Sequence, residues 1–286
     1  MSLKQIFIVL FVVFSFGFLN DKPAYQLFDE KGKKTSYKKI LKEVEGADII
    51  LFGELHNNPI NHWLQYELTK DVYEQINESM VLGAEMFEAD NQNTLNEYLS
   101  GKFDYKTLKT EIKVWPNNTT DYQPLVDFAL KHQLTFVATN IPRRYANMVY
   151  KSGFGALNSI NDDGRKFIAP LPIAYDKELP GYKKIVEMSG GHGGENLPKA
   201  QAIKDATMAH FILKNWKKGQ IFIHYNGTYH SNNFEGISWY LNNEKAGLKI
   251  VTIGAVEQDK IDSLAEENIG IANFTICTPT TMTKTH

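Results

Sequence analysis

Two side chains capable of acid–base or metal chemistry, Glu54 and His56, follow a short apolar run at residues 48–52. The run is typical of a buried strand. The segment 57–59, Asn-Asn-Pro, favours the start of a helix, because asparagine caps helix N-termini and proline fits the first turn. We expect that helix to reach about Ile76. Glu54 and His56 are therefore predicted on a strand-to-helix turn, at the strand end where open α/β sheets place ligand sites.

Polar side chains also close or follow three further apolar runs of the same kind. Because the carboxyl ends of parallel strands share one edge of a sheet, we expect all of these groups to converge on one crevice. They are Glu85 and Glu88 after the run 80–85, Asn140, Arg143 and Arg144 after the run 134–139, and His224, Tyr225, Tyr229 and His230 after or at the end of the run 220–225.

Two carboxylates and two imidazoles stand out in this set: Glu54, Glu85, His56 and His230. Such ligands suit a hard-to-borderline divalent metal ion such as zinc, manganese or iron. The same four groups could instead form an acid–base arrangement around a water molecule. The residue types leave both interpretations open.

Several of the polar residues also have ordinary structural interpretations. A glutamate at a strand end, such as Glu85, is often an N-cap or a partner of a nearby arginine. His62 and His210 fall within helical patterns, so we predict surface or packing roles for them. His192 lies between glycines and fits either a ligand or a solvated loop. Arg143 and Arg144 suit a solvated pair or a pocket mouth that grips carboxylates.

The elements that must position these residues alternate along the chain. Further apolar runs at 249–253 and 272–277 complete a series without polar alternation, as expected for a parallel sheet covered on both faces. Helical periodicity fills the gaps between the runs. We therefore predict a layered α/β fold with a mostly parallel sheet and helices on both faces.

Residues 21–286 are predicted to form a single domain with two interruptions. Residues 91–118 have helical patterns and no strand, which indicates a helical excursion from the sheet. Residues 160–199 contain prolines and the glycine-rich run 189–194. A segment of this length and composition predicts a lid-like insertion.

The N-terminal residues 1–20 are predicted to be a signal peptide or an N-terminal anchor. Lys4 precedes an apolar stretch, 6–19, of about signal-peptide length. We expect export, with the mature chain starting between Phe18 and Lys22, or membrane association if the segment is not cleaved. The one cysteine, Cys277, excludes an internal disulfide and lies far from a lipid-attachment position. A net charge of −2 without long runs of one sign argues against nucleic-acid binding.

The motifs at the strand ends resemble those of the haem-binding uptake proteins of the ChaN family. This family belongs to a wider superfamily with the erythromycin esterases and the Tiki metalloproteases, which place Glu and His at matching turns. The resemblance extends in order from about Asp48 to Pro279. It is carried by Gly53-Glu54-Leu55-His56, Gly83-Ala84-Glu85-Met86-Phe87, Asn140-Ile141-Pro142-Arg143-Arg144, the segment 201–209 and the turn 227–230.

The resemblance implies an exported bacterial protein of the periplasm or outer cell envelope that binds haem for iron uptake. It further implies tyrosine ligation of haem and a homodimer formed on haem binding. A phenolate is a hard anionic donor and suits ferric haem. The candidate haem-contacting residues are Tyr145, Tyr225 and Tyr229 as ligands, Arg143 and Arg144 for the propionates, and His192.

Two functions therefore remain after the sequence is considered. The first, which we favour, is a haem-binding protein that serves iron uptake. The alternative is a metal-dependent hydrolase of the wider superfamily, in which Glu54, His56, Glu85 and His230 hold a divalent metal ion or activate water.

Overall fold

A computed structural model describes residues 22–76, 79–189 and 194–286. Its centre is a seven-stranded sheet in the order β1-β7-β6-β2-β5-β3-β4. All neighbouring strands are parallel except β1, which pairs antiparallel with β7. The strands are β1 (Gln26–Asp29), β2 (Ile49–Glu54), β3 (Met80–Glu88), β4 (Thr135–Asn140), β5 (Ile221–Gly227), β6 (Ile250–Gln258) and β7 (Phe274–Pro279).

The predicted α/β fold is confirmed, and each of the six apolar runs forms a strand close to its expected position. Strand β1 was not predicted. It has four residues, of which only the central two are buried, so it lacks the continuous apolar run that marks the inner strands. The other strands are buried along most of their length, as a sheet covered on both faces requires.

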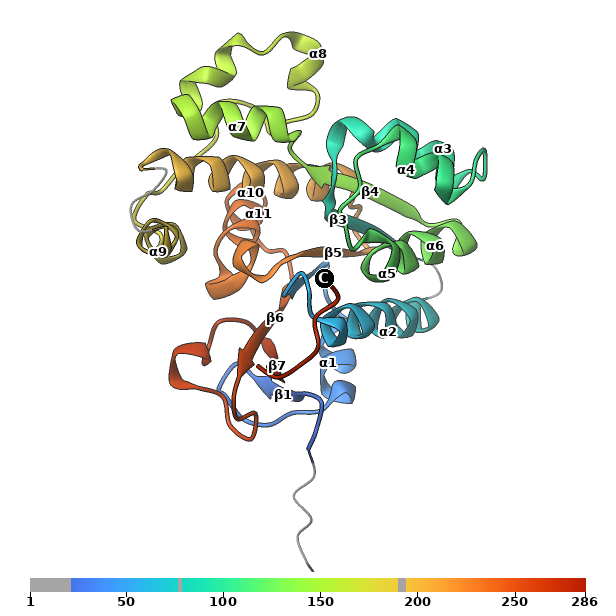
Figure 1. Ribbon diagram of the computed structural model, residues 1–286, viewed down its shortest axis with the longest axis vertical. Coiled ribbons are helices and arrows are strands. Elements are labelled where there is room, and N and C mark those ends of the chain that lie inside the picture. The colour runs from blue at the N-terminus through green and yellow to red at the C-terminus, as the bar shows by residue number, and fades with distance from the viewer. Residues whose placement is uncertain (1–21, 77–78, 190–193) are drawn as a thin grey trace, which may run out of the picture.

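Helices cover both faces of the sheet, as Figure 1 shows. Side chains of β2 alternate between two cores: Ile50 and Phe52 pack on one side, whereas Ile49 and Leu51 pack on the other. The first core also includes α1 (Tyr37–Val44), α2 (Pro59–Ile76) and α6 (Gln123–His132). The second core includes α10 (Asn196–Asn215) and α11 (Ile237–Glu244).

The segment 91–118 contains α3 (Gln92–Leu99), α4 (Tyr105–Glu111) and the start of α5 (Asn118–Asp121), with no strand in it. Tyr98 of α3 donates a hydrogen bond to Asp127 of α6 at 2.6 Å, which fixes this helical group beside the sheet. Leu95 and Leu108 contribute to the first core.

Beyond β4 lie α7 (Arg143–Ser152), the short helix η2 (Phe154–Ser159), α8 (Asp162–Arg165) and α9 (Pro180–Met188). A separate apolar cluster that includes Val149, Leu157, Ile160 and Ile203 joins the first part of this region to α10. The predicted insertion 160–199 therefore begins with packed residues, and its function as a lid remains a prediction. His192 and the segment 1–20 lie outside the described residues. In the part of the chain that is described, no helix is both long and apolar enough to cross a membrane.

Candidate functional site

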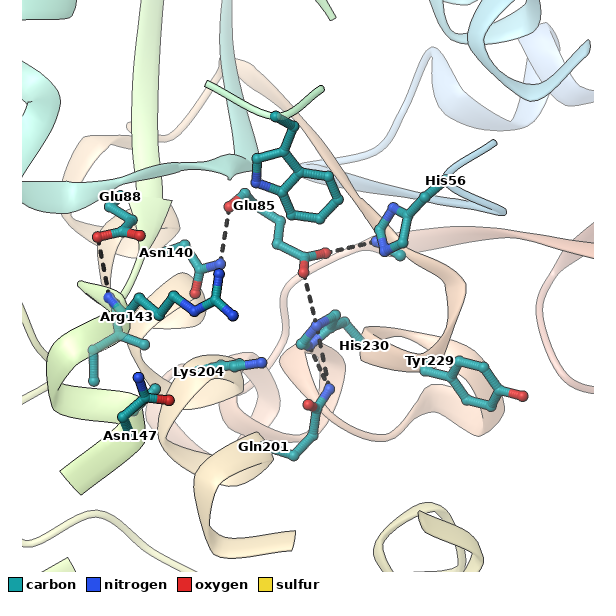
Figure 2. A pocket seen from close by; sticks show the side chains of 14 residues that line it. His56, Glu85, Glu88, Asn140, Arg143, Asn147, Gln201, Lys204, Tyr229 and His230 are labelled. Atoms are coloured by element: carbon teal, nitrogen blue, oxygen red, sulfur yellow. Dashed lines mark hydrogen bonds and ion pairs between the residues drawn. The ribbon is translucent and has the colours of Figure 1, made fainter. Parts of the chain in front are cut away.

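A cavity of about 500 Å³ lies at the carboxyl ends of β3, β4 and β5, between these strand ends and helices α7 and α10. Figure 2 shows the side chains that line it. His56 comes from the turn after β2, Glu85 from β3, Arg143 from the start of α7, and His230 from the turn after β5. Four segments far apart in the sequence therefore meet at one edge of the sheet, as predicted.

The centre of the site is His230, which lies between two carboxylates. Its Nδ1 is 2.5 Å from Oδ1 of Asp205, and its Nε2 is 3.1 Å from Oε1 of Glu85. Asp205 lies on α10, and its second oxygen accepts a hydrogen bond from the Tyr182 hydroxyl of α9 at 3.1 Å. The second oxygen of Glu85 accepts the Gly227 backbone N–H at 2.7 Å. All three ionisable side chains are buried.

This arrangement shifts the pKa values of its members. Burial by itself lowers the pKa of His230, but the charges of Glu85 and Asp205 outweigh it and raise that pKa to about 10. Burial by itself raises the pKa of Glu85, but the charge of His230 holds it well below its usual range. For Asp205 burial is the larger effect and raises the pKa. His230 is therefore an imidazolium at neutral pH.

Glu54 and His56 form a second pair on the same edge. His56 Nδ1 is 2.8 Å from Oε1 of Glu54, which also accepts the Tyr122 hydroxyl at 2.6 Å. Gln65 donates to Oε2 at 2.6 Å. Burial by itself lowers the pKa of His56, but the hydrogen bond to Glu54 and the nearby carboxylates raise it. The imidazole is thus oriented by a buried, fully hydrogen-bonded carboxylate.

Gly227 lies between the two pairs. It is opposite Glu54 in the β2–β5 register, and its N–H binds Glu85. A Cβ atom at this position would be 2.7 Å from Nε2 of His56 and 3.5 Å from Oε2 of Glu85. Only a residue without a side chain lets His56 and Glu85 approach the strand end from both sides.

The predicted convergence of Glu54, His56, Glu85 and His230 is therefore found, but the four do not form one ligand set. Both oxygens of Glu54 and of Glu85, and both ring nitrogens of His230, already have protein partners. Among the described residues, no group of three or more His, Cys, Asp or Glu is arranged to hold a metal ion. The geometry instead gives two carboxylate–imidazole pairs.

The three candidate tyrosines occupy different environments. Tyr225 is fully buried beneath the sheet edge, and its hydroxyl is 2.5 Å from Thr69 Oγ1, so our expectation that it lies at the crevice is wrong. It fails because the last residues of a strand still alternate between the two faces. Tyr145, on α7, packs against the apolar cluster that joins this helix to α10. Tyr229 lines the cavity rim, and 55% of its surface is exposed.

The two candidate arginines also lie in different environments. The guanidinium of Arg144 is 2.5 Å from Asp90 and lies over the Tyr145 ring, outside the residues that line the cavity. Arg143 extends into the cavity (Figure 2). Its backbone N–H, at the start of α7, donates to Glu88 at 3.0 Å, which explains Glu88 as a helix N-terminal partner.

Sequence reasoning assigned no role to several residues of the site. His62 was expected at the surface or in packing, yet it is buried 3.5 Å from Glu54 and 3.3 Å from Asp121. Asp205 and Lys204 belong to a segment we used only as a family motif. A signal for Asp205 exists: it is a carboxylate among Ala202, Ile203 and Ala206, on an otherwise apolar helix face. Tyr122 and Gln65 carry no such signal.

Chemically, the site can do two things. The imidazolium of His230 can donate a proton or stabilise developing negative charge, and the cavity beside it can bind a ligand of small-molecule size. Burying so many ionisable groups costs free energy, and such clusters are concentrated at functional sites.

The family model described as "Haem-binding uptake, Tiki superfamily, ChaN" matches residues 40–241. Among solved structures, the one that reports cofacial haem binding to ChaN of Campylobacter jejuni has a TM-score of 0.66 at 19% identity, and covers 88% of this chain and 96% of that one. A chloroplastic protein of Arabidopsis thaliana, RETICULATA-RELATED 5, is 25% identical over 146 residues, 49% of this chain and 19% of its own length. This chain thus spans about a fifth of that relative.

Proposed function

The chain belongs to the haem-binding uptake family of the Tiki superfamily, ChaN, and we propose that it binds haem through Tyr229. The observation that carries this proposal is the position of Tyr229. Of the three tyrosines considered, it alone combines an exposed ring with a place at the rim of the cavity.

The surroundings of Tyr229 fit a flat, largely apolar ligand with an acidic edge. Met188 of α9 lies beside it, with Sδ 3.8 Å from the tyrosine hydroxyl, and 61% of its surface is exposed. The ring extends away from Arg143 and Lys204, which occupy the opposite side of the cavity (Figure 2). When bound, ferric haem would supply an iron that accepts a phenolate ligand, and Tyr229 would provide that phenolate.

We further propose export to the periplasm or outer cell envelope and dimer formation on haem loading. The apolar N-terminal stretch 6–19 supports the first, and the exposed position of Tyr229 supports the second, since a ring that projects from the surface can reach a second copy. Both extend the role in haem-binding uptake that the family description names.

A titration of the purified mature chain with haemin tests the binding proposal. We expect saturable binding and, by size-exclusion chromatography, a shift from monomer to dimer on loading. Tyr229→Phe should abolish the saturable phase. Tyr145→Phe is the matched control, since the hydroxyl removed lies outside the cavity. Non-saturable binding in the wild type counts against the proposal.

A second function is favoured by one separate observation, the buried Asp205–His230–Glu85 chain beside the cavity. Haem ligation by a tyrosine does not need these groups. We propose acid catalysis of hydrolysis as the alternative. In it the substrate displaces Glu85 from Nε2 of His230 and accepts the Nε2 proton on its leaving oxygen, water attacks the ester, and Asp205 holds Nδ1 in place. Because its pKa is raised to about 10, His230 suits this role better than that of a base.

Release of p-nitrophenol from a panel of carboxylic and phosphoric esters tests this alternative. We expect turnover in the wild type, and a loss of at least about a hundredfold in His230→Gln, the range of general acid catalysis. Circular dichroism establishes that the variant is folded. Absence of turnover with every ester speaks against the alternative and leaves the haem proposal untouched.

A further inference from the structure

Two cationic side chains end inside the cavity on the side opposite Tyr229. Arg143 enters from the start of α7 and Lys204 from α10, and both point toward the centre (Figure 2). Within the described part of the chain, neither the guanidinium of Arg143 nor the ammonium of Lys204 has a hydrogen bond or ion pair. The proposed ligation of haem by Tyr229 needs neither charge.

Each carboxylate near them already accepts at least one other hydrogen bond. Glu85 binds His230 and the Gly227 N–H, and Glu88 accepts the backbone N–H of Arg143. Asp205 is bound by His230 and Tyr182. Lys204 and Arg143 therefore present free donors to the cavity.

Asn140 adds an acceptor to the same wall. Its amide nitrogen donates to the Glu85 carbonyl at 2.9 Å, which leaves the side-chain oxygen Oδ1 facing away from that bond. Oδ1 is buried, and among the described residues it has no hydrogen-bond partner. A buried acceptor without a donor costs free energy. Because Oδ1 is closed to water in this structure, a ligand hydroxyl or N–H would bind it after a small shift of the surrounding side chains and would remove that cost.

We propose that Arg143 and Lys204 form an oxyanion site in this cavity. Its ligand is a small carboxylate or phosphate that carries a hydroxyl group. Arginine binds both anions through two parallel hydrogen bonds, and lysine adds a point charge. Asn140 accepts the ligand hydroxyl, and Trp115 and Ile141 supply apolar walls. The volume of about 500 Å³ admits a molecule of this size.

The propionates of haem are oxyanions of the same kind. If they are the ligand of this site, the inference rests on the proposed function. The two sources are distinguished by separate measurements. One measures the binding of a small anion in the absence of haem. The other compares the affinity for haem with the affinity for its dimethyl ester, which has no free carboxylates.

The first measurement is calorimetric titration of the full chain with glycerol 3-phosphate, at constant ionic strength. We expect saturable binding, weakened about tenfold in Arg143→Gln and in Lys204→Gln, as loss of a charged hydrogen bond implies. Lys151→Gln and Lys199→Gln are matched controls on the same two helices and should bind as the wild type does. Lys199 lines a different pocket, next to Glu195.

The second measurement applies if glycerol 3-phosphate does not bind. A wild type that binds haem about tenfold more tightly than its dimethyl ester, with the preference lost in both Gln variants, assigns the oxyanion site to the propionates. No small-anion binding together with equal affinity for haem and its ester overturns the inference. If haem itself does not bind, the proposed function fails, and the glycerol 3-phosphate titration alone decides the inference.

Discussion

His230 of the turn after β5 lies 2.5 Å from Asp205 of helix α10, with both side chains buried. The contact joins an element on one face of the sheet to the strand edge where the cavity opens. Glu85 holds the other side of the imidazole, and Tyr182 extends the chain to α9. The protonation of one histidine is thereby linked to the packing of three elements.

Asp205→Asn removes one of the two charges that hold the proton on His230. We expect the pKa of His230 to fall well below the wild-type value of about 10, because burial then opposes the imidazolium with less compensation. NMR titration of the His230 ring protons measures this directly. An unchanged pKa would show that Glu85 alone keeps the imidazole charged.

The protonation of His230 should also make the stability of the protein depend on pH. The pKa of His230 is raised on folding, so its stabilising effect is complete below the unfolded pKa of about 6.5 and is lost as pH rises through about 10. His230→Gln should be less stable than the wild type by about 3–5 kcal/mol near pH 7, because it leaves buried carboxylates without their partner. Urea unfolding should show that the difference in free energy of unfolding between the wild type and His230→Gln is smaller at pH 10 than at pH 7. An equal difference at both pH values would contradict this prediction.

Gly227→Ala tests the close approach of the two pairs. The new Cβ would meet His56 Nε2 at 2.7 Å, so the imidazole must move. We expect a loss of about 1–3 kcal/mol, typical of overpacking at a site that cannot relax freely. Thermal unfolding gives the loss, and the His56 ring signals in NMR should shift. Gly155→Ala, where a Cβ has open space, is the control.

Tyr225→Phe tests whether Tyr225 is a residue of the core or a ligand of haem. Its hydroxyl contacts Thr69, which also donates to the Gln65 carbonyl at 2.6 Å. Removing the hydroxyl should cost about 1 kcal/mol of stability. Haem affinity should stay unchanged, because the side chain is fully buried. A large drop in haem affinity with little change in stability would reverse the assignment.

Much of the fold was predictable because its inner strands are apolar on both faces. Runs such as 80–85 and 220–225 need no knowledge of their neighbours to be recognised. Strand β1 could not be found this way, since two of its four residues lie at the surface and its position depends on pairing with β7, more than 240 residues away in sequence.

The site was predictable where a residue follows a strand and not where it comes from a helix. Glu54, His56, Glu85 and His230 meet at the edge that parallel strands share. Asp205 reaches His230 only because α10 packs across the sheet, and His62 reaches Glu54 from the first turn of α2. Such contacts depend on how helices lie on the sheet, which local spacing does not encode. The face of Tyr225 was misjudged for a different reason: the last residues of β5 still alternate between the two faces of the sheet, and Tyr225 falls on the side of the first core.

Resonance Raman spectroscopy of the ferric haem complex, in the wild type and in Tyr229→Phe, tests the central claim most directly. Excitation of the iron–phenolate transition should show phenolate vibrations in the wild type, and these should be absent in the variant. The free energy of unfolding of the variant should equal that of the wild type. Phenolate vibrations that persist in Tyr229→Phe, or that the wild type lacks, would contradict haem ligation by Tyr229.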